Sequence, residues 1–184
     1  MRVVETVADA KFLKLKRVVD PENNVQGYIF AERLGKDSVA FICYDPNAQL
    51  YGRDGEFLIN HEYTPPTGQY KDRAFGGSLD KNKNPKSIVA DEVLEEAGYL
   101  IAASRVICVG TAFVSTQMNQ QVFLFFVPLA SDELGKAQYV GREPENAVEA
   151  MAEPRWVTED DIMDGDDWKA IAILTKAKRK GLVE

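Results

Sequence analysis

Residues 75–99, FGGSLDKNKNPKSIVADEVLEEAGY, constrain the fold more than any other stretch of the chain. Asn84 is a good helix cap, Pro85 suits a first helical turn, and Gly98 suits the left-handed residue that ends a helix. Apolar residues recur between them at helical spacing. The pair Gly76-Gly77 just upstream permits a tight loop that approaches a ligand closely. The stretch therefore predicts a loop and then a helix that ends at Gly98.

Three glutamates in this stretch, Glu92, Glu95 and Glu96, carry its chemistry. Positions three and four apart share one face of an α-helix. Like charges this close destabilise the helix by a few tenths of a kcal/mol per pair, so the face needs open solvent or a bound cation. Oxygen ligands suit Mg²⁺ or Mn²⁺ better than zinc, and Mg²⁺ usually accompanies phosphates. Most acidic helix faces are simply solvated, so both alternatives stay open for this face taken alone.

The stretch resembles the Nudix box, G-x5-E-x7-R-E-U-x-E-E-x-G-U, in which U is a bulky apolar residue. Without gaps, the chain matches this pattern at Gly77, Glu92, Val93, Glu95, Glu96, Gly98 and Tyr99. Two positions differ, because Lys83 takes the place of the first glutamate and Asp91 that of the arginine. Both changes reverse the charge. We therefore hypothesise a swapped ion pair between Lys83 and Asp91.

The resemblance implies a Nudix-fold α/β/α sandwich with a mixed sheet. It also implies that Glu92, Glu95 and Glu96 hold Mg²⁺, for which Mn²⁺ substitutes, and that these glutamates serve catalysis. The loop at Gly76 and Gly77 would orient the helix and border the substrate. In outline the chain is similar to the ADP-ribose pyrophosphatase group. That similarity implies hydrolysis of the pyrophosphate bond of a nucleoside diphosphate linked to another moiety, such as ADP-ribose.

Other site residues follow from the same resemblance. Arg73 would bind substrate phosphate, although a surface role is equally open. Ser115 and Gln117, in the polar connection between two strands, would contact ribose or base, with a plain hairpin as the alternative. Glu145 or Glu149 would position or deprotonate the attacking water, and a solvated loop is the alternative. A general base must come within hydrogen-bond reach of its water, which a sequence does not show.

Three competing functions stay open. Two are other Nudix activities, on nucleoside triphosphates or on RNA caps. The third is a catalytically silent Nudix-fold protein that binds a ligand, which the substitutions at Lys83 and Asp91 suggest. The absence of a basic stripe counts against RNA.

The rest of the chain predicts one domain, 1–184, made mostly of strands. Residues 1–35 include a run that alternates apolar and basic residues, which indicates a half-buried antiparallel sheet. The resemblance implies that this small N-terminal sheet contributes to a homodimer. Apolar runs predict buried strands at 38–45, 56–63, 103–114 and 120–130, the last of them central, and helical spacing predicts a C-terminal helix within 166–181.

Composition excludes several classes of protein. With 45% hydrophobic and 28% charged residues the chain is an ordinary globular domain, and its net charge of −7 argues against binding nucleic acid or anionic membranes. Cys43 and Cys108 both lie in apolar runs, so we expect buried thiols rather than a disulfide or zinc site. The single histidine, His61, has no partner at metal spacing. No signal core or membrane span is evident, which predicts a cytoplasmic protein.

Overall fold

The computed structural model describes residues 1–33, 37–79, 83–130, 137–142 and 149–183. Its sheet is built on two long apolar strands, β4 (Ser38–Tyr44) and β10 (Met118–Pro128), which run parallel. Strand β9 (Ile107–Ser115) pairs with β10, and β5 (Phe57–Thr64) and β7 (Phe75–Ser78) pair with β4, all antiparallel. Outside these, β5 also pairs with β6 (Gln69–Arg73) and β12 (Glu153–Val157). Both central strands were predicted, and β10 is central as expected.

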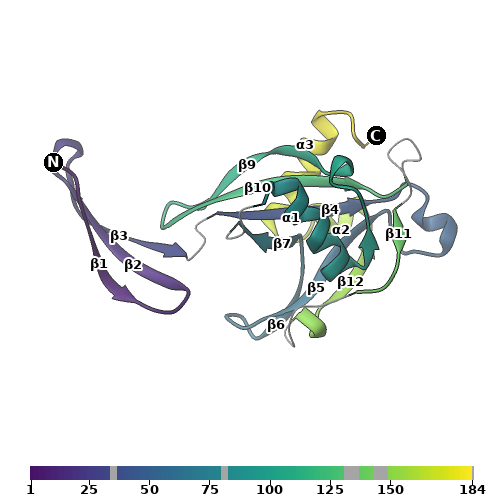
Figure 1. Ribbon diagram of the computed structural model, residues 1–184, viewed down its shortest axis with the longest axis horizontal. Coiled ribbons are helices and arrows are strands. Elements are labelled where there is room, and N and C mark those ends of the chain that lie inside the picture. Colours follow the sequence, from purple (N-terminus) through teal and green to yellow (C-terminus); the bar gives the residue numbers. More distant parts are fainter. Residues whose placement is uncertain (34–36, 80–82, 131–136, 143–148, 184) are drawn as a thin grey trace.

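Side chains of the central strands point alternately into two hydrophobic cores, one on each face of the sheet. In β4, Ala40 and Ile42 pack toward α3 (Trp168–Arg179) and the short α2 (Glu159–Met163). Val39, Phe41 and Cys43 pack on the other face, against α1 (Pro85–Glu92). Strand residues alternate between faces with a period of two, so a strand buried on both faces is apolar throughout. The expected α/β/α sandwich is confirmed (Figure 1).

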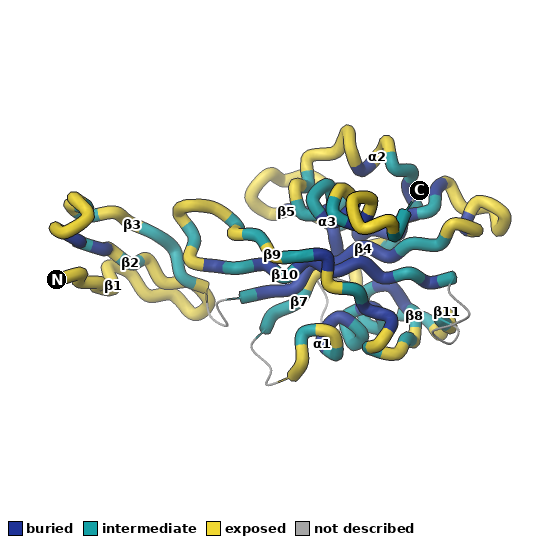
Figure 2. The backbone as a smooth tube through the Cα atoms, turned by 90° about the horizontal axis from the view of Figure 1, so that it is seen from above, coloured by how far each residue is buried: buried dark blue, intermediate teal, exposed yellow. Residues whose placement is uncertain are grey.

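The N-terminal residues form an arm outside the sandwich. Strands β1 (Val3–Asp9), β2 (Leu13–Asp20) and β3 (Val25–Arg33) make the predicted small antiparallel sheet. It joins the body where β3 meets the start of β10, with the Ala31 amide donating to the Gln117 carbonyl at 2.7 Å. Figures 1 and 2 show the arm extending away from the sandwich, with most of its residues exposed.

The box helix begins and ends at the predicted residues. Asn84 accepts a hydrogen bond from the Lys86 amide at 2.9 Å, Pro85 occupies the first turn, and Gly98 adopts φ 78°. However, the helix is α only over Pro85–Glu92 and continues as a π-helix over Val93–Ala97. A π-turn holds an extra residue. The period of 3.6 residues that placed three glutamates on one face therefore does not continue past Glu92.

Two other expectations need correction. The glycines Gly76 and Gly77 lie in strand β7, paired with Ala40 and Val39, rather than in a loop. Cys43 is buried as predicted, but Cys108 is exposed, because its side chain points outward from β9.

A two-stranded sheet of β8 (Tyr99–Leu100) and β11 (Gln138–Tyr139) follows the box helix. Within the described ranges, no helix has the length and apolar character needed to cross a membrane.

Candidate active site

Two glycines of β7 support two of the box glutamates. The Glu96 carboxylate (Oε2) accepts a hydrogen bond from the Gly76 amide at 3.3 Å. A Cβ atom added to Gly77 would lie only 2.2 Å from Glu92 Oε1, so the Glu92 carboxylate occupies the space that a side chain at Gly77 would fill. The glycine pair therefore lets the box helix place two carboxylates directly on the backbone of β7, the strand that pairs with the central strand β4. Sequence reasoning expected close approach of a ligand here, and the structure shows close approach of the glutamates.

Cys43 lies beneath the box helix on the neighbouring strand β4. Its side chain is fully buried, and burial together with the nearby Glu96 carboxylate raises the pKa of the thiol. The hydrogen bond from Gly76 likewise holds Glu96 close to the sheet surface. All three glutamates, Glu92, Glu95 and Glu96, are only partly buried, so solvent reaches this surface.

The oxygen ligands of the box glutamates suit a hard divalent cation. In the part of the chain that the structure describes, no three Asp, Glu, His or Cys side chains converge in a metal-ligating arrangement. At least one of Glu92, Glu95 and Glu96 would therefore have to rotate to share an ion with the other two. The chemistry of the donors fits Mg²⁺ or Mn²⁺.

The substituted box positions contact one another. Lys83 Nζ lies 2.8 Å from Asp91 Oδ2, and the two side chains are 53% and 44% exposed. The hypothesis of a swapped ion pair is confirmed as a contact. The pair ties the segment before α1 to the last turn of that helix, next to Glu92.

Arg73 lies at the end of β6, opposite Asn60 of β5. Its guanidinium is 3.8 Å from Glu62 Oε1, and Glu62 Oε2 accepts from Asn60 Nδ2 at 3.4 Å. Asn60 is 3% exposed, and its Oδ1 atom has no hydrogen-bond partner in the described residues. Sequence reasoning missed Asn60 and Glu62. The signal that could have found Asn60 is a polar residue at the end of the otherwise apolar run FLIN, whereas Glu62 has no such signal.

His61, on the same strand, contacts a carboxylate of the neighbouring strand β6. Its Nδ1 atom lies 2.6 Å from Asp72 Oδ1, and its ring stacks on Tyr70. The second oxygen of Asp72 lies 3.4 Å from Arg155. In the described chain, the contacts of His61 are thus with Asp72 and Tyr70 of the neighbouring strand β6.

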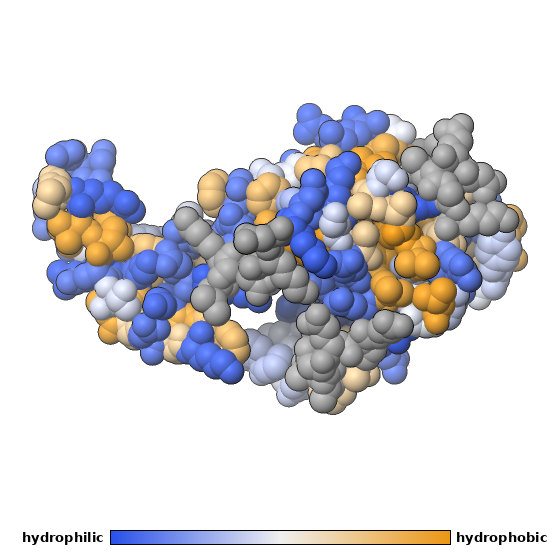
Figure 3. All heavy atoms as spheres, in the orientation of Figure 1, coloured by the Kyte–Doolittle hydropathy of each residue, from blue (hydrophilic) through white to orange (hydrophobic). Residues whose placement is uncertain are grey.

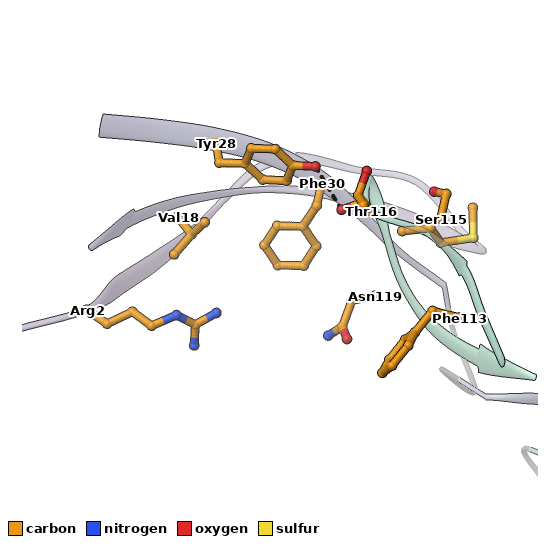
Figure 4. Close-up of a pocket in the computed structure, with 9 residues that line it drawn as sticks. Arg2, Val18, Tyr28, Phe30, Phe113, Ser115, Thr116 and Asn119 are labelled. Carbon is orange, nitrogen blue, oxygen red and sulfur yellow. Dashed lines mark hydrogen bonds between the residues drawn. The ribbon is translucent and has the colours of Figure 1, made fainter. Parts of the chain in front are cut away.

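Ser115 and Gln117 lie at the turn between β9 and β10, where the hairpin meets the arm. Ser115 lines a cavity of about 420 Å³ together with Tyr28 and Phe30 of the arm and Phe113 of β9 (Figure 4). Gln117 does not line it, but its amide donates to Ser115 Oγ at 3.2 Å. No box residue lines this cavity. The structure thus separates these two predicted residues from the glutamates.

The proposed loop carboxylates fall largely outside the described residues. Glu145 lies in the segment 143–148, which the structure does not describe. Glu149 begins a short 3-10 helix, Glu149–Met151, but its side chain is not described. Their proposed role in positioning water stays a prediction.

Comparisons with known proteins support the fold. No protein-family model matches the chain, and no curated protein matches its sequence. Among solved structures, the crystal structure of an ADP compounds hydrolase superimposes with a TM-score of 0.71, covering 98% of this chain and 95% of that one. The two sequences are 13% identical. At this identity the likeness shows a shared fold.

Proposed function

We propose that this protein is a hydrolase of the Nudix kind that cleaves the pyrophosphate bond of a nucleoside diphosphate linked to another moiety, ADP-ribose or a similar compound. The observation that carries the proposal is the close contact of Glu92 with Gly77 and of Glu96 with Gly76 in β7. A solvated acidic helix face needs no such support from a neighbouring strand. The hydrolase with the same fold acts, by its name, on ADP compounds, which agrees with this substrate class.

Different residues would bind the metal, support its ligands and orient the attacking water. Glu92, Glu95 and Glu96 would hold Mg²⁺, or Mn²⁺ in its place, and the bound cation would neutralise pyrophosphate charge and activate water. Gly76 fixes Glu96 through its amide, and Gly77 leaves room for Glu92. Glu145 or Glu149 would then orient or deprotonate the attacking water.

The cavity beside Ser115 is our candidate for the distal end of the substrate. Gly77 pairs with Val39, which pairs with Phe123 of β10, so Gly77 lies at the level of Phe123 in the sheet. Ser115 pairs with Met118 of the same strand. Five strand residues separate these two levels, roughly 17 Å at the usual rise. Aromatic side chains at Tyr28 and Phe113 suit stacking with a base. An extended dinucleotide-like substrate reaches both sites more readily than a compact nucleotide does, which favours ADP-ribose over a nucleoside triphosphate.

We further propose that the arm joins two copies in a homodimer. Leu13, Leu15 and Arg17 are two residues apart along β2 and therefore point to the same face, the outer face of the arm. Ile29 of β3 pairs with Arg17, so Ile29 shares this face with Leu13 and Leu15. These three side chains are 40%, 41% and 53% exposed. Figure 3 shows apolar side chains gathered on the arm. An apolar face of this kind on a thin sheet needs a covering partner.

The two free thiols, Cys43 and Cys108, suit a reducing compartment such as the cytoplasm.

The test is a panel of compounds incubated with the protein and Mg²⁺, Mn²⁺ or chelator. The panel contains ADP-ribose, NADH, diadenosine polyphosphates, sugar nucleotides and nucleoside triphosphates, with phosphorus NMR to identify the products. Metal-dependent release of two phosphomonoesters from ADP-ribose or a similar compound is the expected result. Cleavage of triphosphates alone would overturn the substrate class.

A second candidate, a ligand-binding protein without turnover, is favoured by one observation. The box glutamates of the described chain do not converge on a common point. In that case, folded protein would bind ADP-ribose in calorimetry and yet release no product with either metal.

A further inference from the structure

A second, polar cavity lies on the opposite face of the sheet from the box helix. Its volume is about 310 Å³, within the range of small-ligand sites. It opens beside the start of α3, on the face where Val122 packs with that helix, and none of the box glutamates lines it. Three cations from three separate elements line it: Arg33 of β3, Arg73 of β6 and Lys169 of α3.

The two acids that line this cavity are already engaged. Asp166 forms an ion pair with Lys71. Asp167 accepts from the Ala74 amide through Oδ2 at 2.7 Å and from the Lys169 amide through Oδ1 at 3.3 Å. Their oxygens are therefore poorly available to bind a cation.

The cations are less engaged than the acids. Arg73 has a long ion pair with Glu62, at 3.8 Å, and it also helps to hold the pKa of the Asp166 carboxyl below its usual range, after the larger effect of Lys71. For Arg33 and Lys169 the described chain contains no ion-pair partner. In a protein with a net charge of −7, a cavity that gathers three cations favours an anion.

A buried neutral pair adds hydrogen-bonding capacity. Gln120 Nε2 donates to Ser38 Oγ at 3.1 Å, and the two residues are 6% and 9% exposed. Because the Ser38 oxygen accepts this bond, the hydroxyl proton is left to donate to a ligand in the cavity. Guanidinium, ammonium and hydroxyl donors together match the several oxygens of a tetrahedral anion.

We propose that this cavity binds a phosphate group through Arg33, Arg73, Lys169 and Ser38. The ligand is inorganic phosphate or the phosphate of a small phosphomonoester. The inference does not rest on hydrolase activity, because the cavity contains none of the metal-binding glutamates and lies across the sheet from them.

Isothermal titration calorimetry tests the proposal with chelator present, so that no divalent cation bridges phosphate to the box. Inorganic phosphate and ribose 5-phosphate are the two ligands tested. The one that binds with the lower Kd shows whether the cavity takes free phosphate or a phosphomonoester. We expect saturable one-site binding that Arg33→Gln and Lys169→Gln each weaken about tenfold, the usual effect of losing one charge-assisted hydrogen bond. The matched control is Arg179→Gln, which removes the same charge from the far end of the same helix and should leave the affinity unchanged.

Three results would overturn the proposal: no saturable binding to the wild type, equal affinity in Arg33→Gln and Lys169→Gln, or an equal loss in Arg179→Gln. Thermal melts establish that each variant is folded, and Ser38→Ala gives an independent weakened variant if either charge change prevents folding. Phosphate binding that survives Glu96→Gln would separate this site from the proposed active site, so that either proposal can fail alone.

Discussion

At the scale of single residues, the most informative feature is the reversed charge pair in the box. Lys83 and Asp91 lie 2.8 Å apart, at positions where the resembling pattern has glutamate and arginine. Reversing the charge at both positions keeps an attractive ion pair only if the two side chains are in contact. Lys83 and Asp91 are in contact. The departure from the Nudix pattern is therefore compatible with an intact box helix.

This contact predicts a specific double-mutant cycle. Lys83→Glu and Asp91→Arg should each lower the free energy of unfolding, because each places like charges side by side. Both side chains are about half exposed, so the losses should not exceed about 1 kcal/mol. The double variant should recover most of the loss, as measured by urea unfolding at low salt. A double variant no more stable than either single one would contradict the swapped pair.

At the scale of elements, strand β7 and the box helix act together. Gly77→Ala would push its Cβ into the Glu92 carboxylate, the movable end of a flexible side chain. We expect a loss of stability below about 1 kcal/mol, because the side chain can turn away, with a clear loss of kcat because Glu92 leaves its place.

Gly55→Ala is the matched control for this change. A Cβ atom there would lie 2.0 Å from the backbone carbonyl carbon of Val157, which cannot turn away. We expect it to lower the free energy of unfolding by about 1–3 kcal/mol or more, the usual cost of overpacking. Urea unfolding and initial rates for both variants check the contrast. Equal stability losses, or unchanged kcat in Gly77→Ala, would contradict the role given to β7.

The elements also show what the sequence could and could not predict. The limits of the box helix followed from Asn84, Pro85 and Gly98, because caps are local. Strand β4 followed from its unbroken apolar run. In contrast, Gly76-Gly77 has low strand propensity, and it is paired only because β4 provides a partner. The π-turn after Glu92 also has no signature in the residue pattern.

The candidate site was less predictable than the fold, because it depends on contacts between distant segments. The glutamates were found from their spacing, but their support by β7 was not. Ser115 and Gln117 lie near the box in sequence order but stand at the far end of a long hairpin. Arg33 and Lys169 are far apart in sequence, so no local pattern connects them to one cavity.

At the scale of the whole molecule, the exposed arm predicts the oligomeric state. Wild-type protein should show about twice the chain mass of 20.5 kDa in size-exclusion chromatography with light scattering. Leu15→Glu places a charge on the outer apolar face of the arm and should give a monomer. Val4→Glu makes the same change on the opposite face of the arm, where Val4 pairs with Val18, and should remain dimeric. A monomeric wild type, or dimers in both variants, would contradict the proposed interface.

The central claim is that the box glutamates hold a catalytic divalent cation, and the Mg²⁺ dependence of ADP-ribose hydrolysis in wild type and Glu96→Gln tests it most directly. We predict a wild-type rate that saturates with Mg²⁺ and vanishes with chelator. In Glu96→Gln, kcat should fall by about 10²–10³ or more while the melting temperature stays close to that of the wild type. The exposed control Glu22→Gln, on the arm, should keep full activity. Wild-type turnover in Glu96→Gln, or hydrolysis that persists in chelator, would contradict the claim.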